Sequence, residues 1–113
     1  MSKGSKTWQA AALVAALPEG DTGEERYLEP FVSGDVSLGI YAPQGVDEQH
    51  PHDKDEFYFI VSGSGQFLHG DQRTPFESGD ALFVPAGEEH RFEDFTSDFS
   101  AWVVFWEPRD DHA

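Results

Sequence analysis

Short apolar segments separated by turn residues cover most of the chain after its first two dozen positions. In each segment of four to nine residues, apolar side chains alternate with polar ones or run together, as in half-buried and buried strands. Gly, Asp, Ser and Pro close the segments at the intervals typical of β-sandwiches and barrels. The pattern predicts an all-β domain with strands at Glu25–Phe31, Val36–Tyr41, Glu56–Ser62, Gly65–His69, Ala81–Val84, His90–Phe95 and Ala101–Trp106.

The first 20 residues differ, because they hold an Ala-rich apolar run without alternation. We predict a short amphipathic helix from Thr7 to Leu17, with Thr7 as its N-cap and Pro18 ending it. The run is short and lacks a clean cleavage site, so we expect a cytoplasmic protein. The chain then divides into a helical extension at 1–20, a β-barrel domain at 21–108 and a frayed tail at 109–113.

The amino-acid composition limits the number of domains, the cysteine chemistry and the kinds of partner. A chain of 113 residues supports one domain, and its ten Phe, three Trp and three Tyr favour strands. It has no cysteine, so disulfides, thiolate ligands and thiol nucleophiles are excluded. A net charge of -15 repels phosphate backbones and anionic lipids, and no segment is long enough for a transmembrane helix. We therefore expect neither nucleic acid nor a membrane as partner.

The candidate chemistry lies in two turn-rich segments that contain three of the five histidines. His50 and His52 are two residues apart, so on an extended segment both imidazoles project from one face. Glu56 has the same parity, but four extended residues span roughly 13 Å, which is too far for ligands that lie about 2.0–2.2 Å from one ion. The chain must therefore turn between His52 and Glu56. We expect the two histidines to end one strand, Glu56 to begin the next, and the turn before His90 to return the chain to the same point.

Three imidazoles and one carboxylate, His50, His52, Glu56 and His90, would suit one divalent Fe, Mn, Ni, Co, Cu or Zn ion, and would suit Ca or Mg poorly. Two coordination positions would remain for water, oxygen or a substrate. The alternative is an ordinary solvated run of charges, because His-x-His alone is a weak signal.

The spacing of these residues resembles the two motifs of the cupin superfamily. The first motif is read as Gly45, His50-x-His52, Glu56 and Gly63, with four residues between Gly45 and His50 where the family has five. The second is read as Gly79, Pro85-x-Gly87, His90 and Asp94, where Asp94 replaces the family's Asn. The 15 residues between Gly63 and Gly79 are similar to those of small single-domain bacterial cupins.

This resemblance implies a cupin-type jelly-roll barrel with a metal site, preceded here by the short helix. It implies a metal-dependent enzyme on a small organic substrate, with dioxygenase-type oxidoreductase chemistry favoured. The alternatives are a redox-neutral isomerase or lyase on a sugar-derived or carbonyl substrate, and a non-catalytic cupin that binds a small ligand such as a sugar. Glu56, able to leave the metal and act as a base, and Tyr58 are the candidate catalytic residues.

Parity predicts which aromatic side chains face the barrel interior. Tyr58 and Ile60 share the parity of Glu56 and should point inward, as should Phe92 with His90. Strands that are apolar on both faces, such as Phe57–Val61 and Trp102–Trp106, need a second cover, so we expect a homodimer. Tyr41 and Gln49 are weaker candidates beside the metal, whereas His69 and His112 are expected to lie in solvent, away from it.

Overall fold

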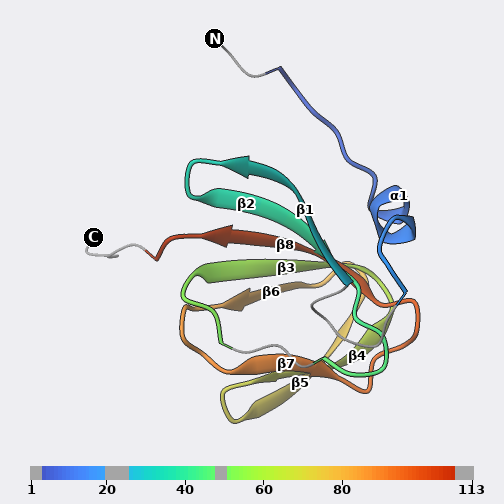
Figure 1. Cartoon of the computed structure of the whole chain (residues 1–113). Helices are drawn as coiled ribbons and strands as arrows, with labels where there is room; N and C mark the ends of the chain where they lie inside the picture. The colour runs from blue at the N-terminus through green and yellow to red at the C-terminus, as the bar shows by residue number, and fades with distance from the viewer. Residues whose placement is uncertain (1–3, 20–25, 48–50, 109–113) are drawn as a thin grey trace.

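Two antiparallel sheets face one another in the computed structural model, which describes residues 4–19, 26–47 and 51–108 (Figure 1). The larger sheet has the strand order β1-β2-β8-β3-β6 and the smaller one the order β5-β4-β7. This arrangement confirms the predicted all-β cupin-type fold with a short helix before it. The elements are α1 (Ala10–Ala15), β1 (Tyr27–Ser33), β2 (Val36–Tyr41), β3 (Asp55–Ser62), β4 (Ser64–His69), β5 (Gln72–Glu77), β6 (Ala81–Val84), β7 (His90–Glu93) and β8 (Ser100–Trp106).

The predicted strands agree with the observed ones to within two residues at each described end, but β5 was not predicted. Its sequence, Gln-Arg-Thr-Pro-Phe-Glu, contains a proline and buries only Phe76. Proline is tolerated because β5 is the outer strand of its sheet, where a backbone donor can be missing. The prediction was wrong here because an edge strand needs little apolar alternation.

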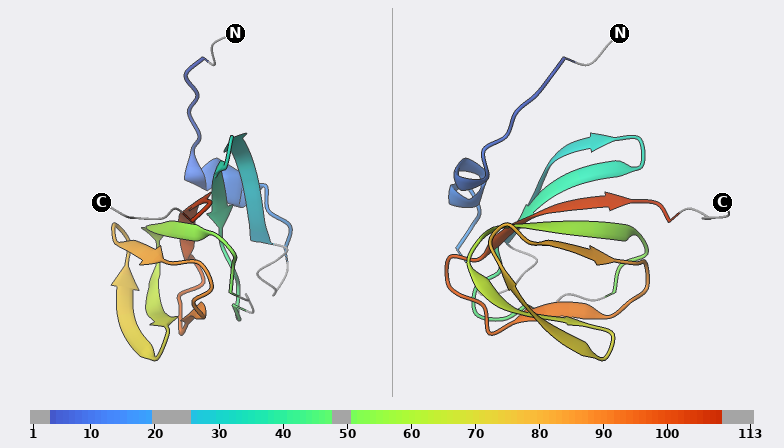
Figure 2. Two further views of the ribbon diagram at one scale, coloured as in Figure 1. Left: turned by 90° about the vertical axis from the view of Figure 1, so that its left-hand side faces the viewer. Right: turned by 180° about the vertical axis from the view of Figure 1, so that it is seen from behind.

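The N-terminal helix is shorter than predicted. It spans only Ala10–Ala15, and its N-cap position is Gln9 rather than Thr7, with no side-chain capping bond. Trp8 instead packs its ring against Phe31 of β1, with ring centroids 5.3 Å apart. This contact ties the residues before the helix to β1. The helix lies beside β1 and β2 at one end of the larger sheet (Figure 2).

The core between the sheets is mainly aromatic. Phe92 lies at its centre, with ring centroids 4.9 Å from Tyr58, 5.3 Å from Phe76 and 4.7 Å from Phe99. Tyr58, Ile60 and Phe92 are each less than 5% exposed, so the predicted inward faces of β3 and β7 are confirmed. One end of this interior is filled by phenylalanines, whereas the other end holds histidines and carboxylates.

Candidate metal centre

Three potential ligands from both sequence motifs meet at one end of the barrel. His52 lies on the loop before β3, Glu56 near the start of β3, and His90 at the start of β7. Glu56 Oε1 lies 3.1 Å from His52 Nδ1 and 2.8 Å from His90 Nε2. The three side chains each offer a ligand atom within 4.8 Å of the others, which places them to bind a metal ion. His50, the fourth predicted ligand, lies outside the described residues.

The loop geometry around His52 is partly as predicted. The chain does bend at Asp53 and Lys54, which lets Glu56 approach His52. However, residues 51–54 are irregular, so His52 does not end a strand as we expected. Its position is set by the backbone of the second motif instead, because the Gly87 N–H donates to the His52 carbonyl at 2.7 Å. The Ala86 N–H likewise donates to Asp55 Oδ1 at 2.9 Å.

Glu56 is a buried carboxylate with an incomplete set of partners. The residue is 0% exposed, and Oε2 has no hydrogen-bond partner among the described parts of the chain. Burial alone would raise the pKa of Glu56, but the hydrogen bonds and positive charges of His52 and His90 outweigh it and lower the pKa. A buried anion with one unpaired oxygen is costly unless a cation completes it. The donor set therefore fits a divalent metal.

His90 is oriented for ligation by its second nitrogen. Its Nδ1–H donates to the Glu88 carbonyl at 2.9 Å, which directs Nε2 toward Glu56 and toward the Tyr58 hydroxyl, 3.1 Å away. Such a bond to a carbonyl fixes the tautomer of a metal-binding histidine. Burial alone would lower the pKa of His90, but the hydrogen bonds to Glu56 and the Glu88 carbonyl raise it overall. A metal would replace the proton shared with Glu56.

A buried aspartate missed by the sequence reasoning supports the loop that precedes His50. Asp47 is 4% exposed and accepts hydrogen bonds from the Tyr41 hydroxyl and, at 2.8 Å, from the Phe92 N–H. Burial and the Asp47 charge raise the pKa of Tyr41, so its hydroxyl stays a donor. Asp47 thus links Tyr41 to the β7 backbone at Phe92. Gln49, the other weaker candidate, lies outside the described residues.

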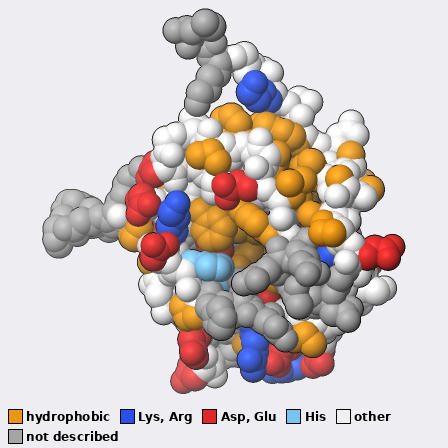
Figure 3. Space-filling view, in the orientation of Figure 1, with side chains coloured by type: hydrophobic (Ala, Val, Ile, Leu, Met, Phe, Trp, Pro, Cys, Tyr) orange, Lys and Arg blue, Asp and Glu red, His pale blue; other side chains and the backbone are white. Residues whose placement is uncertain are grey.

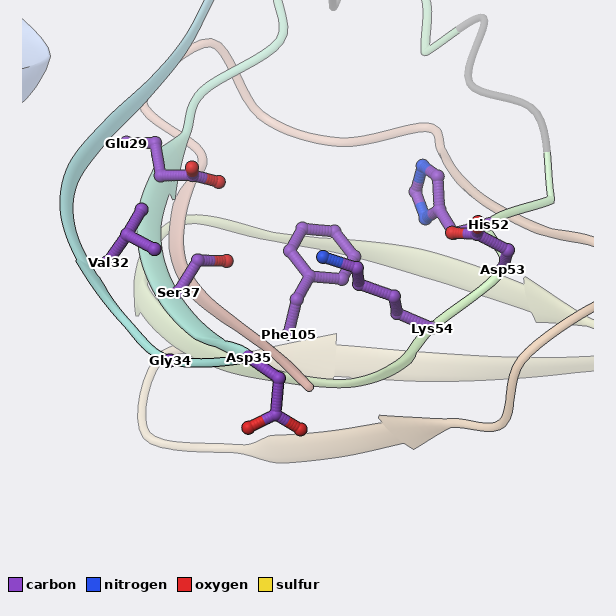
Figure 4. Close-up of a pocket in the computed structure, with 9 residues that line it drawn as sticks. All are labelled: Glu29, Val32, Gly34, Asp35, Ser37, His52, Asp53, Lys54 and Phe105. Carbon is purple, nitrogen blue, oxygen red and sulfur yellow. The ribbon is translucent and has the colours of Figure 1, made fainter. Parts of the chain in front are cut away.

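A surface pocket opens beside the cluster formed by His52, Glu56 and His90. It has a volume of about 260 Å³ and is lined by Glu29, Val32, Gly34, Asp35, Ser37, His52, Asp53, Lys54 and Phe105 (Figure 4). In the space-filling view, a histidine side chain borders a hollow whose wall is apolar and whose rim is acidic (Figure 3). His52 is 33% exposed, whereas the side chains of Glu56 and His90 are 0% and 1% exposed. The pocket is therefore on the accessible side of the group.

Sequence parity could not assign Phe105 or Glu29 to this pocket. Phe105 pairs with Glu56 across β3 and β8, and its ring meets His52 edge-on at 5.2 Å. Parity left open which face of Trp102–Trp106 turns inward. The register of β1 shifts between Leu28 and Phe31, which breaks the simple alternation around Glu29. Only strand pairing reveals both residues.

The histidine His69 is not part of the group, as expected, but it is not simply in solvent. It is partly buried, with its ring stacked on Phe67 at 5.1 Å and its Nε2 3.0 Å from Thr74 Oγ1. His112 lies outside the described residues.

The part of the chain that the structure describes contains no helix long and apolar enough to cross a membrane.

The chain is similar to a known protein family and to proteins of known sequence and structure. A family model for the cupin domain matches residues 37–106. An uncharacterized protein of Streptomyces coelicolor is 37% identical over 84 residues, which are 73% of this chain and 80% of that protein. A cupin 2 conserved barrel domain protein from Salinispora arenicola has a TM-score of 0.66 at 22% identity, covering 95% of this chain and 91% of that one. That structural likeness concerns the fold alone.

Two enzymes match over shorter stretches. An acireductone dioxygenase of Frankia alni is 45% identical over 49 residues, which are 40% of this chain and 24% of the enzyme. A dimethylsulfoniopropionate lyase of Ruegeria pomeroyi is 32% identical over 80 residues, which are 68% of this chain and 39% of the enzyme. This chain therefore spans less than half the length of either enzyme.

Proposed function

The chain belongs to the cupin domain family, and from that premise we propose that it is a metal-dependent enzyme acting on a small organic substrate. His50, His52, Glu56 and His90 hold one divalent transition metal in this proposal. The observation that carries it is Glu56, whose buried Oε2 has no partner in the described structure while Oε1 faces two imidazoles. Nitrogen and oxygen ligands of this kind accept Fe, Mn, Ni, Cu, Co or Zn.

Dioxygenase-type chemistry is the first candidate, and similarity to the acireductone dioxygenase supports it. When bound, a divalent metal would supply Lewis acidity and, if redox-active, a site for oxygen chemistry. The chain's own residues orient the reacting group and move protons. Glu56 either ligates the metal or accepts a proton, and the Tyr58 hydroxyl, 3.1 Å from His90 Nε2, is the nearby donor.

Redox-neutral lyase or isomerase chemistry is the second candidate. The similarity to the dimethylsulfoniopropionate lyase covers 68% of this chain, a larger share than the dioxygenase match. Such a reaction needs a polarised carbonyl or carboxylate and a base, and no oxygen. Glu56 and Tyr58 have the same positions for this role. Oxygen uptake therefore separates the two candidates.

The test begins with elemental analysis of the full chain purified without metal-affinity resin. We expect about one equivalent of metal, and oxygen consumption with a panel of catechols, diketones and enols. Metal without oxygen uptake would favour the lyase or isomerase class. His52→Ala and His90→Ala should abolish stoichiometric metal, and Glu56→Gln should weaken binding less. His69→Ala is the matched control, and full metal content in both ligand variants would contradict the proposal.

We also propose a homodimer formed through the outer face of β3, β6 and β8. Phe57 stacks on Phe59 at 5.6 Å and contacts Phe83 at 5.3 Å and Trp106 at 5.5 Å, yet Phe59 and Phe83 are 42% and 50% exposed. An aromatic face of this kind is typical of an interface. Light scattering should give twice the 12.6 kDa chain mass. Phe83→Glu should give the monomer, whereas Val46→Glu on a loop should not.

A further inference from the structure

The pocket beside His52 carries three acidic side chains and one lysine, which bears on the substrate of the proposed enzyme. This inference rests on the proposed function, because it treats the pocket as the substrate's position. Its inner side is formed by His52 and Phe105, whose rings meet edge-on. A molecule in the pocket thus has the partly exposed metal ligand on one side and an aromatic surface beneath it (Figure 4).

The wall formed by β1 and β2 carries a carboxylate that is exposed but hydrogen-bonded. Glu29 accepts a hydrogen bond from the Tyr27 hydroxyl at 3.0 Å, and its side chain projects toward the pocket (Figure 4). The Tyr27 ring lies over Gly39, where an added Cβ would come within 2.3 Å of the tyrosine hydroxyl oxygen. The absence of a side chain at Gly39 therefore makes room for the residue that holds Glu29.

The opposite wall carries an ammonium group. Lys54 extends from the bend before β3 toward the Glu29 side of the pocket (Figure 4). Its ion pair with Glu107 is loose, at 3.8 Å between two partly exposed side chains. Such a pair contributes little, so the ammonium can turn to a ligand at low cost. Lys54 is the only cation among the described residues that line the pocket.

The remaining acidic groups are placed differently. Asp35 points away from the pocket in Figure 4, and its Oδ2 accepts the Glu107 N–H at 3.2 Å. Asp53 is exposed beside His52. The pocket therefore holds one inward carboxylate, one ammonium and an excess of negative charge at its rim. A second anionic group on a ligand would be repelled by Glu29.

We propose that the substrate is a small organic molecule with one anionic oxygen group and a cationic or hydrogen-bond-donating end. The anionic group would lie near His52, on the side where the metal would be held, and pair with the Lys54 ammonium. The other end lies against the Glu29 carboxylate, which attracts a cation or accepts a hydrogen bond. Glu29 and Lys54 are the specificity-determining residues, and dicarboxylates and phosphorylated compounds are disfavoured.

The test uses the full chain loaded with Co(II) and three probes of similar length, followed by visible absorption. The probes are 3-(trimethylammonio)propionate, its neutral-tailed isostere 4,4-dimethylpentanoate, and the dianion glutarate. We expect the zwitterion to bind about tenfold more tightly than the isostere, which corresponds to a single well-placed charge contact. Glutarate should bind most weakly.

Variants assign the effect to the two walls. Glu29→Gln should remove the advantage of the zwitterion and leave the affinity for the isostere within about twofold. Lys54→Met should weaken all three probes, whereas the control Asp35→Asn should change none. The inference would be overturned if the three probes bound with equal affinity, if glutarate bound most tightly, or if no probe bound. It would also be overturned if Glu29→Gln left the order of the three affinities unchanged. Failure to take up cobalt would overturn the proposed function itself, and this inference with it.

Discussion

The two ends of the barrel interior differ in the elements and in the side chains that form them. At one end, the Phe99 ring centroid lies 5.0 Å from that of Phe76 and 5.3 Å from that of Phe95, and none of these side chains has a polar atom. At the other, Glu56 and His90 are equally buried but polar, and Glu56 leaves one oxygen unpaired. The aromatic end stabilises the folded state, whereas the polar end holds a buried carboxylate that a bound cation would stabilise. Changes at each end should therefore have separable effects.

The largest effect on stability is expected at the aromatic end. Phe99 is 1% exposed and contacts Phe76, Phe92 and Phe95. Phe99→Ala should lower the free energy of unfolding by about 3–5 kcal/mol, because it removes a buried ring and leaves a cavity. Urea unfolding of the metal-free protein measures this loss. A loss below about 1 kcal/mol would show that this end is not the stabilising half.

Two glycines with similar backbone angles provide a matched comparison of the ends. Gly63 has φ +84°, and an added Cβ would lie 2.6 Å from the Phe99 Cα, whereas Gly87 has φ +82° and open space around it. Gly63→Ala should therefore cost about 2–4 kcal/mol, and Gly87→Ala about 1–2 kcal/mol from backbone strain alone.

The same urea unfolding experiment ranks these two variants. Gly87→Ala should in addition weaken metal binding, because the Gly87 N–H holds the His52 carbonyl. Gly63→Ala, if folded, should keep full metal content. Equal destabilisation by the two substitutions, or metal loss in Gly63→Ala, would break the distinction between the ends.

The smallest effect is a response to pH that only the polar end should show. Because the pKa of His90 is raised, protons compete with the metal for Nε2 above the ordinary histidine value of about 6.5. As the pH rises, the metal affinity should increase about tenfold per pH unit for each proton that the metal displaces. Above the raised pKa of His90, the affinity should level off.

Competition with a chelator of known affinity, repeated between about pH 6 and 8.5, measures this slope. His69→Ala serves as the control, because His69 is outside the group and should leave the slope unchanged. A flat profile would mean that His90 does not exchange its proton for a metal.

The comparison also explains which parts of the molecule were predictable from sequence. Strands β2 and β6 were predicted to the residue because apolar side chains and flanking turns mark them. The ligand candidates were predictable because turn glycines and histidines recur at motif spacings, and Gly45, Gly63, Gly79 and Gly87 all have positive φ. Asp94 also has positive φ, at 51°, a conformation that Asn and Asp tolerate better than most residues.

Other features depend on contacts between distant residues and could not be predicted. Trp8 packs on Phe31 just before the helix begins at Ala10, a contact that no local signal reveals. Phe105 faces the pocket because of its pairing with Glu56, and alternation alone left both faces of β8 equivalent. The position of Glu29 at the pocket depends on a shift in the pairing register of β1 with β2. Long-range pairing decided each case.

The two prolines in the outer strands have a consequence for the behaviour of the chain at high concentration. Because the sheets are separate, the described residues leave an outer edge at β1, β6, β5 and β7. Pro30 interrupts β1 and Pro75 interrupts β5, while β6 and β7 are only four residues long. A proline offers no N–H to an incoming strand, and a short edge offers few. An acidic, strand-rich chain with exposed aromatic rings is thereby protected against edge-to-edge aggregation, which leaves its side-chain surfaces for specific association.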